Sequence, residues 1–174
     1  MQPADVILVH GETFLGWLIR LIERIRCRSR EDRRFAHWSH AALVVSPKGH
    51  IVEVLARGVV LSSLGKYRKH DYVCISVSLG TEDRIKAVRY ALRCQQQRYS
   101  VSGLLFLIAA MLVRDSFRIP DFGQQGCATL ISRALECGGM SFARRAVEMT
   151  PADLAKHFKA EPPADLPGRR SEVS

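Results

Sequence analysis

The chain has 174 residues, of which 47% are hydrophobic and 25% are charged, and with this balance one domain can bury its own core. We therefore expect a single domain over residues 1–160 and no second domain. The 26 lysines and arginines exceed the 17 acidic residues and give a formal net charge of +9, so the surface attracts anions. Nucleic acid is still not the expected partner, because the chain has no zinc-finger spacing, no helix-turn-helix signature and no basic segment interleaved with aromatic residues.

The N-terminus and the cysteines indicate the compartment. Met1-Gln2-Pro3-Ala4 leads directly into the strand-like run 5–9, without the basic start, apolar stretch and cleavage site of a signal peptide. The five cysteines are an odd set without a Cys-x-x-Cys pair, which argues against a disulfide framework and for a reducing environment. We expect cytoplasmic synthesis without a cleaved signal. Delivery by another export route and association with a membrane both stay open.

A helix is predicted next, from Phe14 onward. Its apolar residues recur at helical spacing and predict a stripe that covers the core: Phe14, Trp17, Leu18, Leu21, Ile22 and Ile25. The charged residues of the same segment are expected on the outer side: Arg20, Glu23, Arg24 and Arg26.

A polar segment over 27–37 follows, called here the arginine loop. Its arginines concentrate positive charge just before residue 40: Arg28, Arg30, Arg33 and Arg34. An anionic membrane surface and a negatively charged wall polymer would both suit this charge. A solvated basic loop without a specific partner is the default interpretation.

Residues 38–55 predict a β-hairpin, because two strand-like runs flank the turn sequence Ser46-Pro47-Lys48-Gly49. With Lys48-Gly49 as a two-residue loop, position 44 pairs with 53 and position 40 with 57. His40 and Glu53 then share one face of the sheet, because cross-strand partners point the same way and alternate positions repeat it. A one-residue change in loop length would separate them. Glu53 is the candidate to orient the His40 imidazole, and an exposed strand glutamate is the plain alternative.

The sheet and its helical cover continue beyond the hairpin. We expect strands at 58–61 and 72–78, and helices at 82–96 and from Thr150. The proline-rich tail over 161–174 is expected to be disordered.

The apolar segment from Leu104 to Val113 is too short for a membrane span, which needs about 20 residues. A buried helix is therefore its first interpretation. Contact with lipid, or with a greasy substrate channel, is the second.

Cys127 supplies the other half of a candidate site. Gly123-Gln124-Gln125-Gly126 breaks the backbone and residues 128–136 then predict a helix, so Cys127 lies at a helix N-terminus. Free N–H groups and the positive end of the helix dipole favour a thiolate there and offer donors to an oxyanion. Such a thiol and a strand histidine like His40 are the nucleophile and base of a cysteine hydrolase, provided that the fold brings them together. A buried apolar cysteine is the default alternative.

These motifs, in this order, resemble the circularly permuted NlpC-type papain-like hydrolases, which include the YiiX-like bacterial and phage proteins and, more distantly, the lecithin:retinol acyltransferases. The matching segments are Asp5-Val6-Ile7-Leu8-Val9, Ser39-His40-Ala41-Ala42-Leu43-Val44, Glu53, Tyr99, Cys127 and Thr150-Pro151-Ala152-Asp153-Leu154. The resemblance implies an α+β, permuted papain-like fold, with a central antiparallel sheet or partial barrel packed against helices. It also implies that His40 is the base, Glu53 the third polar residue and Cys127 the nucleophile, with Tyr99 lining the substrate cleft. Ala128-Thr129 departs from the family, in which Ser-Glu or Ser-Gly more usually follows the cysteine.

The sequence therefore predicts a thiol hydrolase that cleaves amide bonds, in peptides or cell-wall peptides, through a triad of Cys127, His40 and Glu53 and a thioester intermediate. Gln125 is a further candidate for oxyanion stabilisation, because it precedes the helix start. This chemistry needs no cofactor, and no metal is expected, because a strand points His37 and His40 to opposite faces. Two alternatives stay open: a lipid acyl hydrolase or acyltransferase at an anionic membrane surface, and a basic binding protein on the same fold without chemistry.

Overall fold

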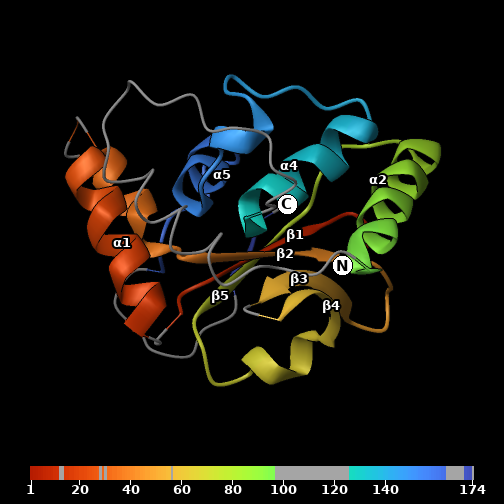
Figure 1. The fold of residues 1–174 in the computed structure, drawn as a ribbon, viewed down its shortest axis with the longest axis horizontal. Helices are drawn as coiled ribbons and strands as arrows, with labels where there is room; N and C mark the ends of the chain where they lie inside the picture. Colours follow the sequence, from red (N-terminus) through yellow and green to blue (C-terminus); the bar gives the residue numbers. More distant parts are fainter. Residues whose placement is uncertain are drawn as a thin grey trace.

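The computed structural model describes residues 1–11, 14–27, 29, 31–55, 57–96, 126–163 and 171–173. At its centre is a six-stranded sheet in the order β4-β3-β2-β1-β5-β6 (Figure 1). In chain order the strands are β1 (Val6–Val9), β2 (His40–Val44), β3 (His50–Leu55), β4 (Gly58–Ser63), β5 (Tyr72–Ile75) and β6 (Ser171–Val173). Neighbouring strands from β4 to β5 are antiparallel, whereas β6 lies parallel to β5.

Helices cover one face of this sheet, so the class is α+β as predicted. The helices are α1 (Phe14–Arg26), α2 (Thr81–Arg93), α4 (Cys127–Cys137) and α5 (Pro151–His157). The described residues also form short 3-10 helices: η1 (Asp32–His37), η2 (Leu64–Tyr67), η3 (Cys94–Gln96) and η4 (Ala146–Glu148). Helix α4 lies over the sheet between α2 and α5, and α1 stands at one end of the molecule (Figure 1).

The alternation of side chains along the strands divides the core in two. On the helical side, strand residues such as Val6, Leu8 and Leu43 pack with buried residues of α4 and α5. On the other side a smaller cluster gathers under η2: Ile7, Val9, Ala42, Val44, Ile51 and Tyr67. Both faces of the central strands are therefore buried, which explains their almost uninterrupted apolar sequences.

The hairpin forms where the sequence predicts it, but the predicted two-residue loop is wrong. Ala42 pairs with Glu53 and Val44 with Ile51, because Ser46–Gly49 makes a four-residue turn closed by Val45 and His50. Gly49 takes a φ of +84° within that turn, a conformation that glycine adopts without strain. The register differs from the expected one by two residues, and since side chains alternate with a period of two, His40 and Glu53 keep a common face.

Helix α1 is rotated relative to the sequence prediction. Trp17, Leu21 and Ile25 were expected to face the core, but they are 50%, 40% and 73% exposed. Ile22 is buried as predicted, and Glu23, which was expected on the outer side, is buried as well. The apolar residues of this helix extend around much of its circumference, so their spacing alone did not define the inner face.

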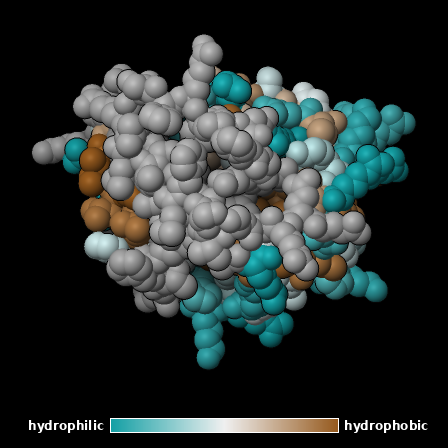
Figure 2. Space-filling view, in the orientation of Figure 1, coloured by the Kyte–Doolittle hydropathy of each residue, from teal (hydrophilic) through white to brown (hydrophobic). Residues whose placement is uncertain are grey.

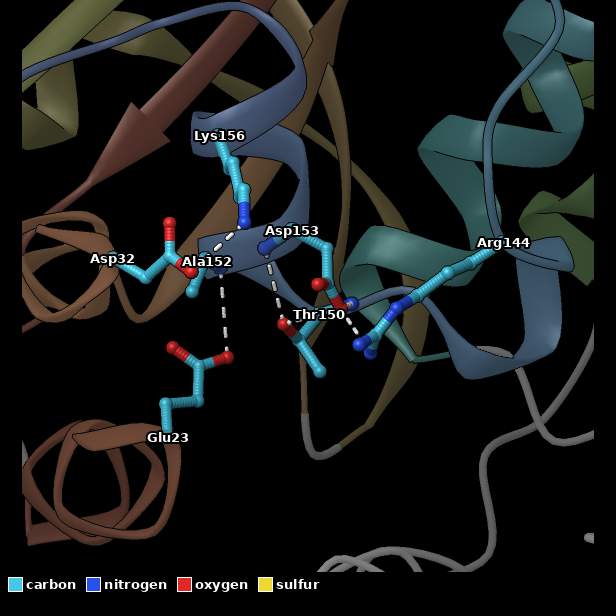
Figure 3. Close-up of polar contacts among 7 residues, drawn as sticks. All are labelled: Glu23, Asp32, Arg144, Thr150, Ala152, Asp153 and Lys156. Carbon is cyan, nitrogen blue, oxygen red and sulfur yellow. Dashed lines mark hydrogen bonds and ion pairs between the residues drawn. The ribbon is translucent and has the colours of Figure 1, made fainter. Parts of the chain in front are cut away.

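Glu23 can occupy the inner face because it is neutral near pH 7. Burial raises its pKa to about 8, against the lowering effect of hydrogen bonds with Thr150 and Ala152. The Ala152 amide lies 3.5 Å from Glu23 Oε1. Figure 3 shows the Glu23 side chain pointing from α1 towards the first turn of α5, beside the ion pair of Asp32 and Lys156.

Several predicted features lie outside the described residues: Arg28, Arg30, Tyr99, Gln125 and the apolar segment 104–113. Within the C-terminal segment that was expected to be disordered, Ser171–Val173 forms β6 and pairs with the open edge of β5. No helix among the described residues is long and apolar enough to cross a membrane.

Gly16 lets α1 approach the loop after β1. A Cβ atom at this position would lie 2.7 Å from the Gly11 carbonyl oxygen, which belongs to backbone and cannot move aside easily. The helix propensity of alanine would favour Gly16→Ala by up to about 1 kcal/mol, but overpacking against backbone costs typically about 1–3 kcal/mol and should outweigh it.

We therefore expect Gly16→Ala to lower the midpoint of urea unfolding, followed by circular dichroism. Gly80→Ala is the control, because a Cβ there meets no atom closer than 3.9 Å. Equal stability of the two variants would show that α1 does not pack as closely as described.

Candidate active site

Cys127 is the first residue of α4, and Gly126 caps the helix in an extended conformation. Leu130 and Ile131, both fully buried against the sheet, anchor the helix and so determine where its N-terminus lies. The Cys127 thiol is partly buried and interacts with the backbone amides of Ala41 and Ala128. The prediction that this cysteine begins a helix is confirmed at the level of local structure.

His40 begins β2, opposite Val9 of β1. Its Nε2 atom lies 2.8 Å from Glu53 Oε2. Because an ionised carboxylate only accepts hydrogen bonds, Nε2 carries the proton and Nδ1 is the nitrogen available to the thiol. Glu53 on β3 thus hydrogen-bonds to His40 on β2, and His40 interacts in turn with Cys127 on α4.

The charges of the thiol and the imidazole stabilise each other. Burial alone disfavours the thiolate, but the hydrogen bond and the positive charge of His40 outweigh it, so the pKa of Cys127 is lowered. Burial likewise disfavours the imidazolium, whereas hydrogen bonds with Cys127 and Glu53 raise the pKa of His40 to about 9. The lowered pKa of the thiol and the raised pKa of the imidazole both favour a thiolate–imidazolium pair over two neutral groups.

Glu53 is fully buried and nevertheless ionised. Burial would raise its pKa, but hydrogen bonds from His40, Lys66, Ser62 and Tyr67 lower it to about 2. The Tyr67 hydroxyl donates to Oε2 at 2.5 Å, and the Lys66 ammonium pairs with Oε1. A buried carboxylate with several donors and a cationic partner is stable where an isolated one would take up a proton.

Sequence reasoning missed Lys66 and Tyr67. Both lie on η2, which follows β4 and packs on the face of the sheet that carries Glu53. No motif marks them, because their contact with Glu53 depends on how the chain turns after β4. The signal that could have found them is physical: a carboxylate expected inside a sheet requires donors, and a tyrosine after a neighbouring strand can supply one.

The remaining histidines near the site serve other contacts. His37 ends η1, and its ring stacks at 4.2 Å between centroids with that of His10, whose Nδ1 lies 3.0 Å from the His37 carbonyl oxygen. Burial and the neighbouring His10 lower the pKa of His37 to about 4, so it is neutral near pH 7. It does not join His40 in a common site.

Comparison with solved structures finds a similar fold. The chain is similar to the crystal structure of the metalloprotein yiiX from Escherichia coli O157:H7, a DUF1105 protein, with a TM-score of 0.57 and 19% sequence identity. The similarity covers 92% of this chain and 84% of that one. No family model matches the sequence, and no curated protein matches it. The likeness thus establishes a YiiX-like α+β fold.

The candidate site does not fit a metal centre. The Lys66 ammonium pairs with Glu53 and stands where a cation bound to that carboxylate would lie. Among the residues that the structure describes, no group of three or more histidine, cysteine and acidic side chains is arranged to hold a metal ion.

Tyr67→Phe tests the support of Glu53. The substitution removes a hydrogen bond to a buried charged group, so we expect a loss of about 1.5–3 kcal/mol in the free energy of unfolding. Tyr72→Phe on β5 is the matched control and should change the stability little. Chemical unfolding monitored by fluorescence measures both, and equal effects would mean that Glu53 does not depend on the Tyr67 hydroxyl.

Proposed function

We propose that the protein is a cysteine hydrolase in which Cys127 is the nucleophile, His40 the base and Glu53 the residue that orients the base. The observation that carries the proposal is the chain of contacts from Glu53 through His40 to Cys127, with opposite pKa shifts at the thiol and the imidazole. The YiiX-like fold is compatible with it. The resemblance of the sequence motifs to permuted NlpC-type papain-like hydrolases supports it further.

The chemistry follows from the placement of these groups. The Cys127 thiolate attacks the carbonyl carbon of the substrate, and a C–S bond forms while the carbonyl π pair moves to oxygen. Amides at the start of α4, such as that of Ala128, are the available donors for this oxyanion. The His40 imidazolium gives its proton to the leaving nitrogen as the C–N bond breaks, leaving a thioester.

Hydrolysis of the thioester completes the cycle. His40, now neutral, takes a proton from water, and the hydroxide attacks the thioester carbon. The C–S bond breaks and returns the thiolate beside the imidazolium. Throughout, the Glu53 carboxylate holds the ring through Nε2 and stabilises its positive charge, with Lys66 and Tyr67 holding the carboxylate.

An amide in a peptide or cell-wall peptide is the proposed substrate bond. A lipid ester is a second candidate, since the same steps cleave esters. The observation that favours it is the exposed apolar face of α1. A binding protein without chemistry would have no use for an activated thiol, so thiol reactivity separates that alternative from both enzymes.

Selective alkylation tests the nucleophile. Cys137 is the most useful comparison, because it is exposed, while desolvation and the nearby Glu136 raise its pKa. If exposure governed reactivity, Cys137 would react before the partly buried Cys127. We expect the reverse, with Cys127 carboxamidomethylated by iodoacetamide at pH 7 about tenfold faster, as mapped by peptide mass spectrometry.

Turnover of the purified variants tests the same residue. Cys127→Ala should reduce turnover by about 10⁴-fold or more, whereas Cys137→Ser should retain activity. Undiminished turnover by a folded Cys127→Ala variant would remove the proposed nucleophile.

The ion pair also predicts the pH dependence. Because the pKa of His40 is raised to about 9, the imidazolium that protonates the leaving group is present below that pH and lost above it. Amide hydrolysis should therefore fall as pH rises through about 9, and fall again at acid pH as the thiolate takes up a proton. Alkylation of Cys127 needs only the thiolate, so it should show the acid limb and no alkaline decline.

An activated aryl ester provides the control, since its leaving group needs no proton. Its hydrolysis should lose less activity above pH 9 than amide hydrolysis does. An alkaline limb near the ordinary histidine pKa, about 6.5, would mean that no stable ion pair exists in the free enzyme.

A further inference from the structure

The exposed face of α1 is unusual for a surface helix. Trp17, Leu21 and Ile25 follow one another at spacings of four residues and form one continuous stripe, named here the α1 stripe. In Figure 2 hydrophobic residues reach the surface at the side of the molecule where α1 lies. The inner face of the same helix holds Gly16, Ile22 and the neutral Glu23, so the apolar stripe is not needed to hold α1 on the protein.

Positive charge borders this stripe. Arg24 projects from α1 itself, and Arg33 is contributed by η1, which packs against α1. Among the described residues, Arg24, Ile25 and Arg33 line an open hollow of about 510 Å³. Arg34 follows on the same 3-10 helix, where it pairs with Glu161. The stripe and the arginines together are the composition of a helix that lies in the plane of a lipid interface.

We propose that the α1 stripe, with Arg24 and Arg33, docks the protein on an anionic phospholipid membrane. The stripe enters the boundary between head groups and acyl chains, where tryptophan is especially favoured. The two guanidinium groups bind head-group phosphates at the hollow beside Ile25. A wall polymer would satisfy the arginines but offers nothing to the apolar stripe, so the membrane accounts for both features together.

The protein carries a natural probe for this proposal. It has two tryptophans. Trp38 is fully buried, and its indole nitrogen donates to the Ala160 carbonyl oxygen at 2.9 Å. Changes in tryptophan emission on addition of vesicles therefore report on Trp17. The experiment uses the full chain carrying Cys127→Ala, so that its outcome is independent of the proposed hydrolase activity.

With vesicles containing phosphatidylglycerol, the emission of Trp17 should shift to the blue and be quenched by brominated acyl chains. Pure phosphatidylcholine vesicles should give much weaker binding, and added salt should weaken binding to the anionic vesicles. Trp17→Phe should abolish the emission change, while co-sedimentation still detects binding.

Three variants on the proposed surface and two controls on α2 locate the site of binding. Arg24→Gln and Arg33→Gln should each weaken binding to anionic vesicles by about fivefold, and Ile25→Ser by about tenfold. Arg89→Gln and Ile85→Ser on α2 replace an exposed arginine and an exposed isoleucine elsewhere, and should leave binding unchanged.

Three kinds of result would overturn the proposal. The first is a lack of selectivity, seen either as equal binding to neutral and anionic vesicles or as equal effects of the variants on the proposed surface and on α2. The second is a Trp17 already shielded from acrylamide in the monomer without lipid, since another part of the same chain would then cover the stripe. The third is a dimer in light scattering that Ile25→Ser dissociates, which would assign the surface to a second copy.

Discussion

A charged carboxylate buried inside the sheet is the constraint on which the candidate site depends. Glu53 has no exposed surface, yet it must stay ionised to hold and charge the His40 imidazole. Left alone it would take up a proton. Lys66 and Tyr67 prevent this, because they supply a cation at Oε1 and a strong donor at Oε2. The reactivity proposed for Cys127 thus depends on residues that do not hydrogen-bond to the thiol themselves.

The fold provides this arrangement with few elements. The hairpin of β2 and β3 sets His40 and Glu53 on a common face, η2 closes over that face, and α4 brings its N-terminus to the start of β2. The α4 contact buries large apolar side chains such as Leu130 and Ile131, which position the thiol without using any reactive group. Packing and chemistry are therefore carried by different residues of the same helix.

Local signals in the sequence were sufficient to predict part of the candidate site. The glycines before Cys127 and the apolar spacing after it predicted a helix start, and the alternation of the hairpin predicted the common face of His40 and Glu53. The common face was predicted correctly despite the wrong loop length, because the register differs by two residues and side chains alternate with a period of two. Lys66 and Tyr67 were not predicted, because their contact with Glu53 depends on how the chain folds back over the sheet after β4.

The inner face of α1 was not predicted from the sequence, for a different reason. Six apolar residues at helical spacing favoured an inward stripe, but the packing is decided by Gly16, which permits close approach, and by Glu23, which burial makes neutral. A charged residue type at an inner position cannot be recognised from sequence when its ionisation depends on the fold. The same rotation leaves Trp17 and its apolar neighbours at the surface.

In the proposed site, His40 is held as an imidazolium by Cys127 on one side and Glu53 on the other. Nuclear magnetic resonance of the histidine ring nitrogens, followed as a function of pH, measures this directly. We predict that His40 titrates near pH 9 in the intact protein and at a clearly lower pH in Cys127→Ala, because the thiolate no longer stabilises the positive charge. A His40 that titrates near 6.5 in both proteins would contradict it.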